Sequence, residues 1–375
     1  MEKNIPCVGI IGYGKMGADI FYEVVSQNMS VVLYTFTESK LQDAANKFSR
    51  IKKRLQKNGL THTADLCCTR DLSDFKNCDI IIETVSEDIN IKRNIYQTLG
   101  KYTDKNTILT TNTSSISIEE LAHYVNDQAK FCGMHFFYPI KLNNIVEIIC
   151  TTTTLESTIS SVETFVNALE MDYVKVRDAP ASVINLILSF YYVESLYILQ
   201  ERLASPGTID RIAKEYFYVG PCESLDIIGL DFFYESISRV ADKNTVINIH
   251  DNKTWKKPDL IDKLILQGRL GRKTGCGLYN YDAEYICDTS LDANLNLHNQ
   301  ETSIFIEKEI RQRLFYSLVN GCMVAARLGL CNEHDVDKGI KKILLMSKGP
   351  LQYVSEMPKE NVIKTFQDLA TNYGQ

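Results

Sequence analysis

The chain lacks the features that mark membrane, disulfide-rich and nucleic-acid-binding proteins. No apolar run is long enough to predict a transmembrane helix, and the one at the N-terminus breaks at glycines before it reaches signal-peptide length. The 11 cysteines are odd in number and form no C-x-x-C pair, so they predict neither a disulfide framework nor a zinc site. A net charge of −6 argues against nucleic acid as a partner, because phosphate binding needs a basic face. We expect a cytoplasmic protein with reduced thiols, no membrane partner and no metal.

The remaining composition is that of a globular protein with room for more than one domain. Of 375 residues, 45% are hydrophobic, which is enough for a full core. Strand and helix patterns alternate through the first half, and this alternation predicts a parallel sheet. The expected strands are residues 31–35, 79–84 and 107–111, and the expected helices are residues 89–99 and 118–125. From residue 180 onward the pattern is helical, beginning with a long apolar helix over residues 183–203.

A glycine-rich loop near the N-terminus follows an apolar strand and precedes a helical pattern. In a dinucleotide fingerprint of the form G-x-G-x-x-G, the first glycine makes the tight turn and the second lets the pyrophosphate approach the backbone. The third glycine lets the helix pack on the strand, and the helix N-terminus faces the phosphates. The loop therefore predicts NAD binding, although an ordinary turn could carry the same pattern. The predicted contacts are Gly12, Tyr13, Gly14, Lys15, Met16 and Gly17.

The second strand ends without the acidic residue that usually binds the adenosine ribose. Thr35 occupies that position, and Glu38 is the nearest carboxylate. No arginine follows at once to bind a 2′-phosphate. We therefore expect NAD rather than NADP, with Thr35 beside the cofactor.

The segment FCGMHFFYPIKLNNIVE, residues 131–147, contains His135 and, beyond a proline-containing turn, Glu147. The residues on either side of the turn have strand patterns, so two adjacent strands could hold the two side chains face to face. Imidazole is the usual group for moving a proton at neutral pH, because its unperturbed pKa is about 6.5. A base oriented by a carboxylate is therefore predicted, and a histidine satisfied in the core is the alternative.

Other polar residues also follow the predicted strands. Glu83, Glu87 and Ser114 lie at or just after strand ends, where ligands bind in open parallel sheets. Each has a simpler explanation as well: Ser114 could cap a turn, and Glu87 could be a solvated charge in a first helical turn. Ser117 is placed to cap the helix over residues 118–125.

These segments together resemble the L-3-hydroxyacyl-CoA dehydrogenase family. The resemblance covers roughly residues 5–282, in the segments VGIIGYGKMG, IIETVSEDINIK, TNTSSISI, GMHFFYP, PASVIN, GPCESLDIIGLD and GRKTGCGLYNY. It implies a Rossmann-type NAD-binding domain followed by an all-α C-terminal domain. It also implies NAD-dependent oxidation of the 3-hydroxyl of an acyl thioester, or the reverse reduction, by a homodimer formed through the helical domain.

The resemblance implies a role for each matching residue. His135 would be the general base, and Glu147 would orient it. Ser114 and Asn185 would hold the substrate oxygen. The implied cofactor contacts beyond the glycine loop and Thr35 are Glu87, Lys92, Ser114, Tyr138 and Lys273.

Several positions depart from the family pattern around the predicted site. Tyr138 stands where the family has asparagine, and Leu186 stands where it has arginine. Residues 180–182 read Pro-Ala-Ser in place of Pro-Gly-Phe. These changes leave the predicted base in place, so we expect an active enzyme with an unusual substrate. The alternative is a non-catalytic NAD-binding protein with a structural or sensory role.

A basic helix is expected over residues 41–57. In the family this region lies beside the CoA nucleotide, so Lys53 and Lys57 are implied substrate contacts. A solvated helix face explains the charges equally well, and an acidic acyl-carrier protein could use the same surface. The basic residues are Lys47, Arg50, Lys52, Lys53, Arg54 and Lys57.

The second half contains a weak internal repeat. Segments 187–221 and 314–350 share an apolar helix, an Arg-Leu pair, an aspartate and a closing Gly-Pro. In this alignment Ile310 stands opposite Asn185, so the later copy is predicted to serve packing. The expected domains are residues 1–178, which bind NAD, 179–287, which are helical, and 300–375, which form a second helical repeat. Residues 288–302 are the expected linker.

Overall fold

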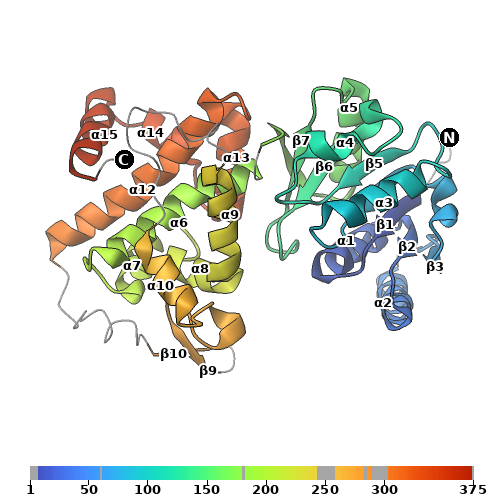
Figure 1. The fold of residues 1–375 in the computed structure, drawn as a ribbon, viewed down its shortest axis with the longest axis horizontal. Coiled ribbons are helices and arrows are strands. Elements are labelled where there is room, and N and C mark those ends of the chain that lie inside the picture. Colours follow the sequence, from blue (N-terminus) through green and yellow to red (C-terminus); the bar gives the residue numbers. More distant parts are fainter. Residues whose placement is uncertain are drawn as a thin grey trace. The chain divides into compact units, whose positions relative to one another are not determined.

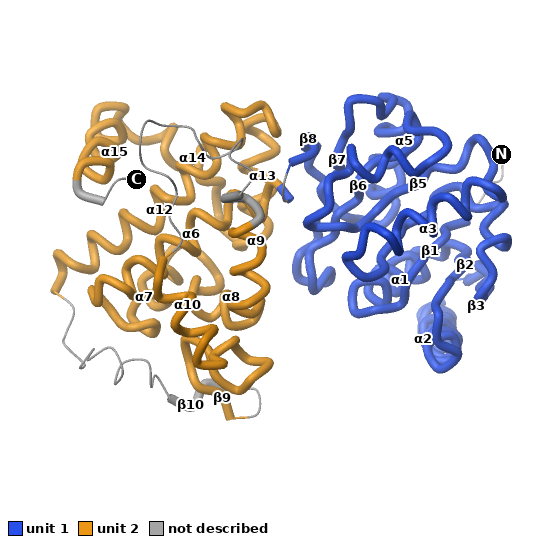
Figure 2. Tube along the Cα trace, in the orientation of Figure 1, with its two compact units in different colours: residues 1–182 blue, residues 183–375 orange. Residues whose placement is uncertain are grey.

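A computed structural model of the protein describes residues 7–59, 61–179, 182–242, 258–282, 285–288 and 303–373. The chain divides into two compact units, Met1–Ser182 and Val183–Gln375, which Figure 2 colours separately. The boundary expected after residue 178 falls between the last strand of unit 1 and the first helix of unit 2. Residues 180 and 181, and nearly all of the expected linker, lie outside the described residues.

Unit 1 is built on one sheet of 8 strands in the order β3-β2-β1-β4-β5-β6-β7-β8. Neighbouring strands pair in parallel except β6 and β7, which are antiparallel. Parallel pairing brings the carboxyl ends of β1, β4, β5 and β6 to one edge, where ligands bind in such sheets. The strands are β1 (Cys7–Ile11), β2 (Ser30–Tyr34), β3 (Leu66–Thr69), β4 (Ile80–Glu83), β5 (Ile108–Thr111), β6 (Phe131–Phe136), β7 (Ile145–Cys150) and β8 (Asp172–Arg177).

Helices flank this sheet, as Figure 1 shows. The expected helix over residues 89–99 is confirmed, and the one expected over 118–125 ends earlier, at Ala122. Ser117 caps it as predicted, because its side chain accepts a hydrogen bond from the Glu120 amide. The helices are α1 (Lys15–Ser26), α2 (Glu38–Lys57), α3 (Ile89–Leu99), α4 (Ile118–Ala122) and α5 (Glu156–Ala168), with two 3-10 turns at Leu72–Asn77 and Gln128–Lys130.

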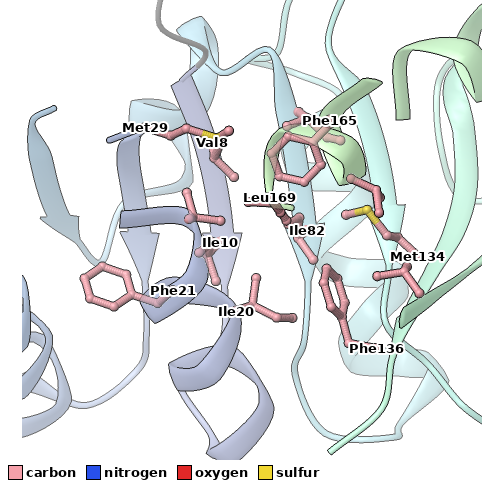
Figure 3. Close-up of a cluster of buried hydrophobic side chains, with 14 of the residues drawn as sticks. Val8, Ile10, Ile20, Phe21, Met29, Ile82, Met134, Phe136, Phe165 and Leu169 are labelled. Atoms are coloured by element: carbon pink, nitrogen blue, oxygen red, sulfur yellow. The ribbon is translucent and has the colours of Figure 1, made fainter. Parts of the chain in front are cut away.

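The core of unit 1 decides which way the strand residues face. In Figure 3, Met134 and Phe136 of β6 point into a buried apolar cluster with Ile20 of α1 and Phe165 of α5. Successive side chains of a strand point to opposite faces, so His135 turns away from this cluster. The same alternation in β7 buries the residues on either side of Glu147 in the cluster. The apolar pattern of the two strands therefore places the histidine and the glutamate on one common face.

Unit 2 is helical, with one small antiparallel hairpin. Its longest helices, α6 and α12, pack against each other. A 3-10 turn lies at Arg272–Thr274. The helices are α6 (Val183–Gln200), α7 (Pro206–Ala213), α8 (Pro221–Ile228), α9 (Leu230–Asp242), α10 (Asp259–Leu266), α12 (Ile304–Arg327), α13 (Glu333–Ile343), α14 (Pro350–Ser355) and α15 (Lys359–Tyr373), and the hairpin strands are β9 (Asn280–Asp282) and β10 (Tyr285–Asp288).

Helix α6 corrects one prediction from the sequence. It has 18 residues and a mean hydropathy of 1.3, so by length and composition it is able to cross a membrane, contrary to the expectation that no segment could. In the structure 83% of this segment is buried within the protein. A helix that is apolar all round is typical of a core helix as well as of a membrane span. Packing against α12 accounts for the apolar composition of α6.

The two segments of the predicted repeat share a capping arrangement. Asp210 of α7 accepts hydrogen bonds from the amides of Cys222 and Glu223 in the first turn of α8. Asp337 of α13 accepts from the two matching amides of α14. Both α8 and α14 begin with a Gly-Pro pair. The matching geometry supports the predicted repeat.

Candidate active site

His135 and Glu147 lie opposite each other on the antiparallel strands β6 and β7. The imidazole Nδ1 is 2.8 Å from Glu147 Oε2, and only 5% of His135 and 0% of Glu147 are exposed. Phe137 packs edge-on against the imidazole, with ring centroids 4.6 Å apart. Because the carboxylate binds Nδ1, Nε2 is the ring nitrogen that can exchange a proton with a ligand. The structure therefore brings together the two residues in the arrangement that the sequence predicts.

The turn between β6 and β7 contains Tyr138. The Tyr138 carbonyl accepts a hydrogen bond from Asn143 Nδ2 at 3.0 Å, which closes the turn. The Tyr138 side chain is 56% exposed. The β6 strand is tied to β5 at its end, because Asn112 Oδ1 accepts from the Phe136 amide at 2.8 Å. The side-chain amides of Asn143 and Asn112 thus hold the backbone of the turn and of the end of β6. The Tyr138 phenol is exposed on unit 1.

Ser114 and Glu87 contact each other at the ends of β5 and β4. Glu87 accepts hydrogen bonds from the Ser114 amide at 2.8 Å, from Ser114 Oγ at 3.3 Å and from Thr113 Oγ1. The Lys92 ammonium lies 3.5 Å from Glu87 Oε2. Glu87 is therefore not an ordinary solvated charge, and Asp88 is the residue that caps α3. Three predicted site residues form one cluster.

Glu83 is a member of this cluster that the sequence did not assign to the site. Its carboxylate and the Lys92 ammonium are 2.8 Å apart, and both residues are 0% exposed. Tyr96 also donates to Glu83, and burial together with this carboxylate raises the pKa of Tyr96 well above its usual value. The phenol thus stays a neutral donor. The sequence signal for Glu83 was a charged residue at the end of the apolar strand IIIE, because a glutamate is rarely buried unless it is paired.

The glycine loop has the geometry of a pyrophosphate site. Gly12 has a φ of +107°, and a Cβ there would lie 2.8 Å from the Thr84 carbonyl oxygen. A Cβ on Gly17 would lie 2.2 Å from the Gly12 carbonyl oxygen, so both positions exclude a side chain. At Gly14, by contrast, no described atom lies within 4 Å of the Cβ position. This open space faces the start of α1, where amides can bind phosphate, so the loop fits the NAD pyrophosphate.

The other predicted cofactor residues differ in exposure. Tyr13 is 6% exposed and packs edge-on against Phe21, so its side chain belongs to the core and only its backbone is left to contact a cofactor. Thr35 is also buried, with 4% exposed. Lys15 is exposed beside the loop, and Met16 is half-buried against the core. The loop backbone, rather than these side chains, forms the phosphate-facing surface.

The basic residues of α2 differ in what they contact. Lys47 donates to the Ala18 carbonyl at 2.9 Å, and Arg54 donates to the Tyr22 hydroxyl at 2.6 Å. Lys47 and Arg54 also lie over the Tyr22 ring, so they attach α2 to α1. Arg50, Lys53 and Lys57 are exposed and, at spacings of three and four residues, lie on one side of the helix. These three residues are called the basic face of α2.

Unit 2 contains two predicted site residues, Asn185 and Lys273, and one residue that departs from the family pattern, Leu186. Asn185 lies in the first turn of α6 and is half-buried. The Lys273 ammonium lies 2.5 Å from Asp231 Oδ1 and 2.6 Å from Oδ2, so its charge is bound to a carboxylate of its own unit. Leu186, at the position of the family arginine, is buried with the other apolar residues of α6.

A mostly parallel sheet with a glycine loop before its first helix, and a His–Glu pair on neighbouring strands, is typical of NAD-binding dehydrogenases. The model of the 3-hydroxyacyl-CoA dehydrogenase NAD-binding domain matches residues 7–179, and that of the C-terminal domain matches residues 183–281. The chain belongs to the 3-hydroxyacyl-CoA dehydrogenase family. It is therefore an NAD-dependent oxidoreductase, like the other members of this family.

Similar proteins include a probable 3-hydroxyacyl-CoA dehydrogenase of Caenorhabditis elegans, 31% identical over 74% of this chain and 97% of the relative. The crystal structure of a (S)-3-hydroxybutyryl-CoA dehydrogenase of Ralstonia eutropha is 29% identical and covers 74% of this chain and 100% of its own, with a TM-score of 0.66. A 3-hydroxybutyryl-CoA dehydrogenase structure of Escherichia coli covers 99% of this chain and 96% of its own, with a TM-score of 0.83 and 21% identity. At 21% identity, the similarity to the Escherichia coli structure shows a shared fold alone.

Proposed function

We propose that the protein oxidises the 3-hydroxyl of a 3-hydroxyacyl-CoA to the 3-keto form, or catalyses the reverse reduction, with His135 as the general base. The contact between His135 Nδ1 and Glu147 Oε2 at 2.8 Å carries this proposal. It lies in the same sheet as the glycine loop, on strands whose ends meet at the ligand-binding edge. The names of the relatives, which are hydroxyacyl-CoA and hydroxybutyryl-CoA dehydrogenases, support the substrate class.

The chain's own residues handle the proton of the reaction. NAD, when bound, accepts a hydride from C3 of the substrate. His135 Nε2 takes the proton of the 3-hydroxyl, while Glu147 holds Nδ1 and stabilises the imidazolium that forms. Ser114 and Asn185 would hold the substrate oxygen, where charge develops in the transition state. In the reverse direction, the imidazolium returns the proton to the 3-keto oxygen.

Turnover of a thioester tests this proposal. Purified protein should consume NADH when acetoacetyl-CoA is added, and the product should be the 3-hydroxy thioester. Cofactor binding is measured in parallel by titration with NADH. Binding of NADH without turnover of any CoA or carrier-bound 3-ketoacyl substrate would contradict the proposal and favour a non-catalytic structural or sensory role.

A carrier-protein thioester is the second candidate substrate, and the basic face of α2 is the surface that an acidic carrier would contact. Arg50, Lys53 and Lys57 are exposed, whereas Lys47 and Arg54 are used in packing. Exposed cations can bind either the phosphates of CoA or an acidic carrier. Charge reversal at Lys53 and Lys57 should raise KM for thioesters of the carrier that binds this face, either CoA or the carrier protein. KM for thioesters of the other carrier should stay nearly unchanged. Lys47→Glu is unsuitable here, because it would disturb the packing of α1.

Two further proposals concern location, indicated by the cysteine content, and assembly, implied by the family resemblance. We propose that the protein acts in the cytoplasm and that it forms a homodimer through the helical unit. Light scattering at several protein concentrations tests the assembly, with a mass of twice the 42.7 kDa chain expected. A single-chain mass at all concentrations would contradict the homodimer.

A further inference from the structure

Glu83 is the most heavily coordinated charged group in the described part of the candidate site. It is the last residue of β4, and its side chain is fully buried. Four donors from three segments reach its two oxygens: the Val85 amide at 2.7 Å, Lys92 Nζ at 2.8 and 2.9 Å, Tyr96 Oη at 3.0 Å and Thr111 Oγ1 at 2.8 Å. Every contact is a donor, so a carboxylate fits this position and an apolar residue does not.

The contacts continue from Glu83 to the residue that is proposed to bind substrate. Lys92 lies 3.5 Å from Glu87 Oε2 as well as 2.8 Å from Glu83 Oε1. Glu87 in turn accepts the amide and hydroxyl hydrogens of Ser114. The Ser114 hydroxyl lies 3.3 Å from Glu87 Oε1, so Glu87 is placed to set the orientation of this hydroxyl. A chain of charged contacts thus connects a fully buried carboxylate to the serine.

Glu83 is also linked to the backbone at the start of the glycine loop. Its bond to the Val85 amide holds the segment that contains Thr84, whose hydroxyl donates to the carbonyls of Ile11 and Gly12 at 3.3 and 3.1 Å. Thr111 precedes Asn112, which binds the end of the strand that carries the histidine. Glu83 therefore connects three strand ends at the ligand-binding edge.

We propose that Glu83 is a positioning residue that holds Lys92, and through it Glu87 and the Ser114 hydroxyl, in the geometry that the reaction needs. This inference rests on the proposed function. A buried ion pair is weak evidence for stability, because the cost of removing two charges from water offsets much of their attraction. The onward contacts of Lys92 to Glu87, and of Glu87 to Ser114, give this pair a further role.

Removing both charges separates positioning from folding. Glu83→Gln alone would leave the Lys92 ammonium buried with a single carboxylate, and this variant could fail to fold. The double variant Glu83→Gln with Lys92→Met removes the cation together with the anion, so it should recover most of the lost Tm. We expect its kcat/KM to remain about 10²-fold below that of the wild type, because a small misplacement of a binding group has that effect. The Kd for NADH is measured in parallel, because Lys92 is also a predicted cofactor contact.

Two readouts decide the outcome. Recovery of kcat/KM along with Tm in the double variant would overturn the proposal and make the pair purely structural. Hydrogen exchange at the Ser114 amide, which donates to Glu87 at 2.8 Å, supplies a readout that needs no activity. We expect faster exchange there in the double variant, and unchanged exchange would also overturn the proposal. A wild type that binds NADH but turns over no thioester contradicts the proposed function instead, and the exchange result still tests the positioning role.

A matched control is the buried pair of Arg313 and Glu194 in unit 2. Its double neutral variant, Arg313→Met with Glu194→Gln, should change Tm but leave exchange at the Ser114 amide at the wild-type rate. Accelerated exchange in this control would show that any loss of a buried pair loosens the loop, and that result would contradict a specific role for Glu83.

Discussion

The two units bury the same kind of charge in different surroundings. In unit 1, Lys92 binds Glu83 at the carboxyl ends of the strands, and Glu87 continues the contacts to loop amides and hydroxyls. In unit 2, the side chain of Arg313 is 1% exposed and binds Glu194 and Glu201, where α12 packs on α6. The difference teaches that a buried ion pair does not itself indicate a site. The groups to which the pair is connected indicate whether it serves chemistry or packing.

This comparison predicts that changes in unit 1 reduce the rate, whereas changes in unit 2 reduce stability. Among variants that keep the His135 base, the largest effect on rate is expected for Glu147→Gln. The variant keeps the shape of the side chain but cannot stabilise the imidazolium of His135, so hydride transfer should slow by about 10²- to 10⁴-fold. Single-turnover oxidation of NADH with acetoacetyl-CoA measures this. Glu156→Gln, an exposed glutamate at the start of α5, is the control. An unchanged rate in Glu147→Gln would remove the carboxylate from the mechanism.

The largest effect on stability is expected for Arg313→Ala. It leaves Glu194 buried without its cation, so the free energy of unfolding should fall by about 3–5 kcal/mol. The matched control is Arg311→Ala, two residues earlier on α12, because Arg311 binds the exposed Glu215 and such pairs contribute only about 0–1 kcal/mol. Denaturant unfolding compares the two variants. Equal losses in both would contradict the assignment of Arg313 to packing.

The aspartates of the two repeat segments should differ in how they make stability depend on pH. Burial raises the pKa of Asp210 to about 6, against the opposing effect of its hydrogen bonds from Tyr279 and from two amides. The folded state therefore binds this proton more tightly than the unfolded state does. Binding of this proton stabilises the folded state by about 3 kcal/mol, a value that follows from the size of the pKa shift. This stabilisation is fully present below about pH 4 and is lost as the pH rises through about 6.

Asp210→Asn should flatten the fall of the unfolding free energy between about pH 4 and 6. Burial also raises the pKa of Asp337, which is half-exposed, so Asp337→Asn should change the slope less. Unfolding curves at several pH values measure both variants. Parallel pH profiles for the wild type and Asp210→Asn would contradict the raised pKa.

The smallest effect is expected at Thr35. A carboxylate at this position would accept a hydrogen bond from the ribose and repel a 2′-phosphate, so Thr35→Asp should increase the preference for NADH over NADPH by about tenfold. The ratio of kcat/KM for the two cofactors measures this. Thr37→Asp, at the N-cap of α2, is a neighbouring control that should leave the ratio unchanged. An unchanged ratio in Thr35→Asp would place the ribose elsewhere.

The alternation of apolar and polar residues on strands predicted the histidine–glutamate pair of the site. His135 and Glu147 sit within apolar alternation on both β6 and β7, and the register then made them face each other. Glu83 carried a weaker signal, its position at the end of an apolar strand, which does not reveal whether the carboxylate faces solvent or four donors. Its partners come from residues 85 to 111, and only the folded sheet assembles them.

Unit 2 shows the same limit of local patterns. The long apolar helix expected over residues 183–203 is present as α6, but its sequence gave no indication of its partner α12, which begins at residue 304. The expectation that no segment could span a membrane was wrong for this helix. Lys273 remains a predicted cofactor contact, and its ion pair with Asp231, 42 residues away, is a contact that its own segment does not indicate. Both outcomes depend on contacts distant in sequence, which a local pattern cannot supply.

Hydride transfer by His135→Ala tests the central claim most directly. Wild type, His135→Ala and the control His123→Ala, an exposed histidine, are mixed with NADH and acetoacetyl-CoA in single turnover, and the Kd for NADH is measured for each. We predict a loss of about 10²- to 10⁴-fold for His135→Ala alone, with NADH affinity unchanged, because the general base is removed while the glycine loop is intact. Oxidation of NADH by His135→Ala at the wild-type rate would contradict the account.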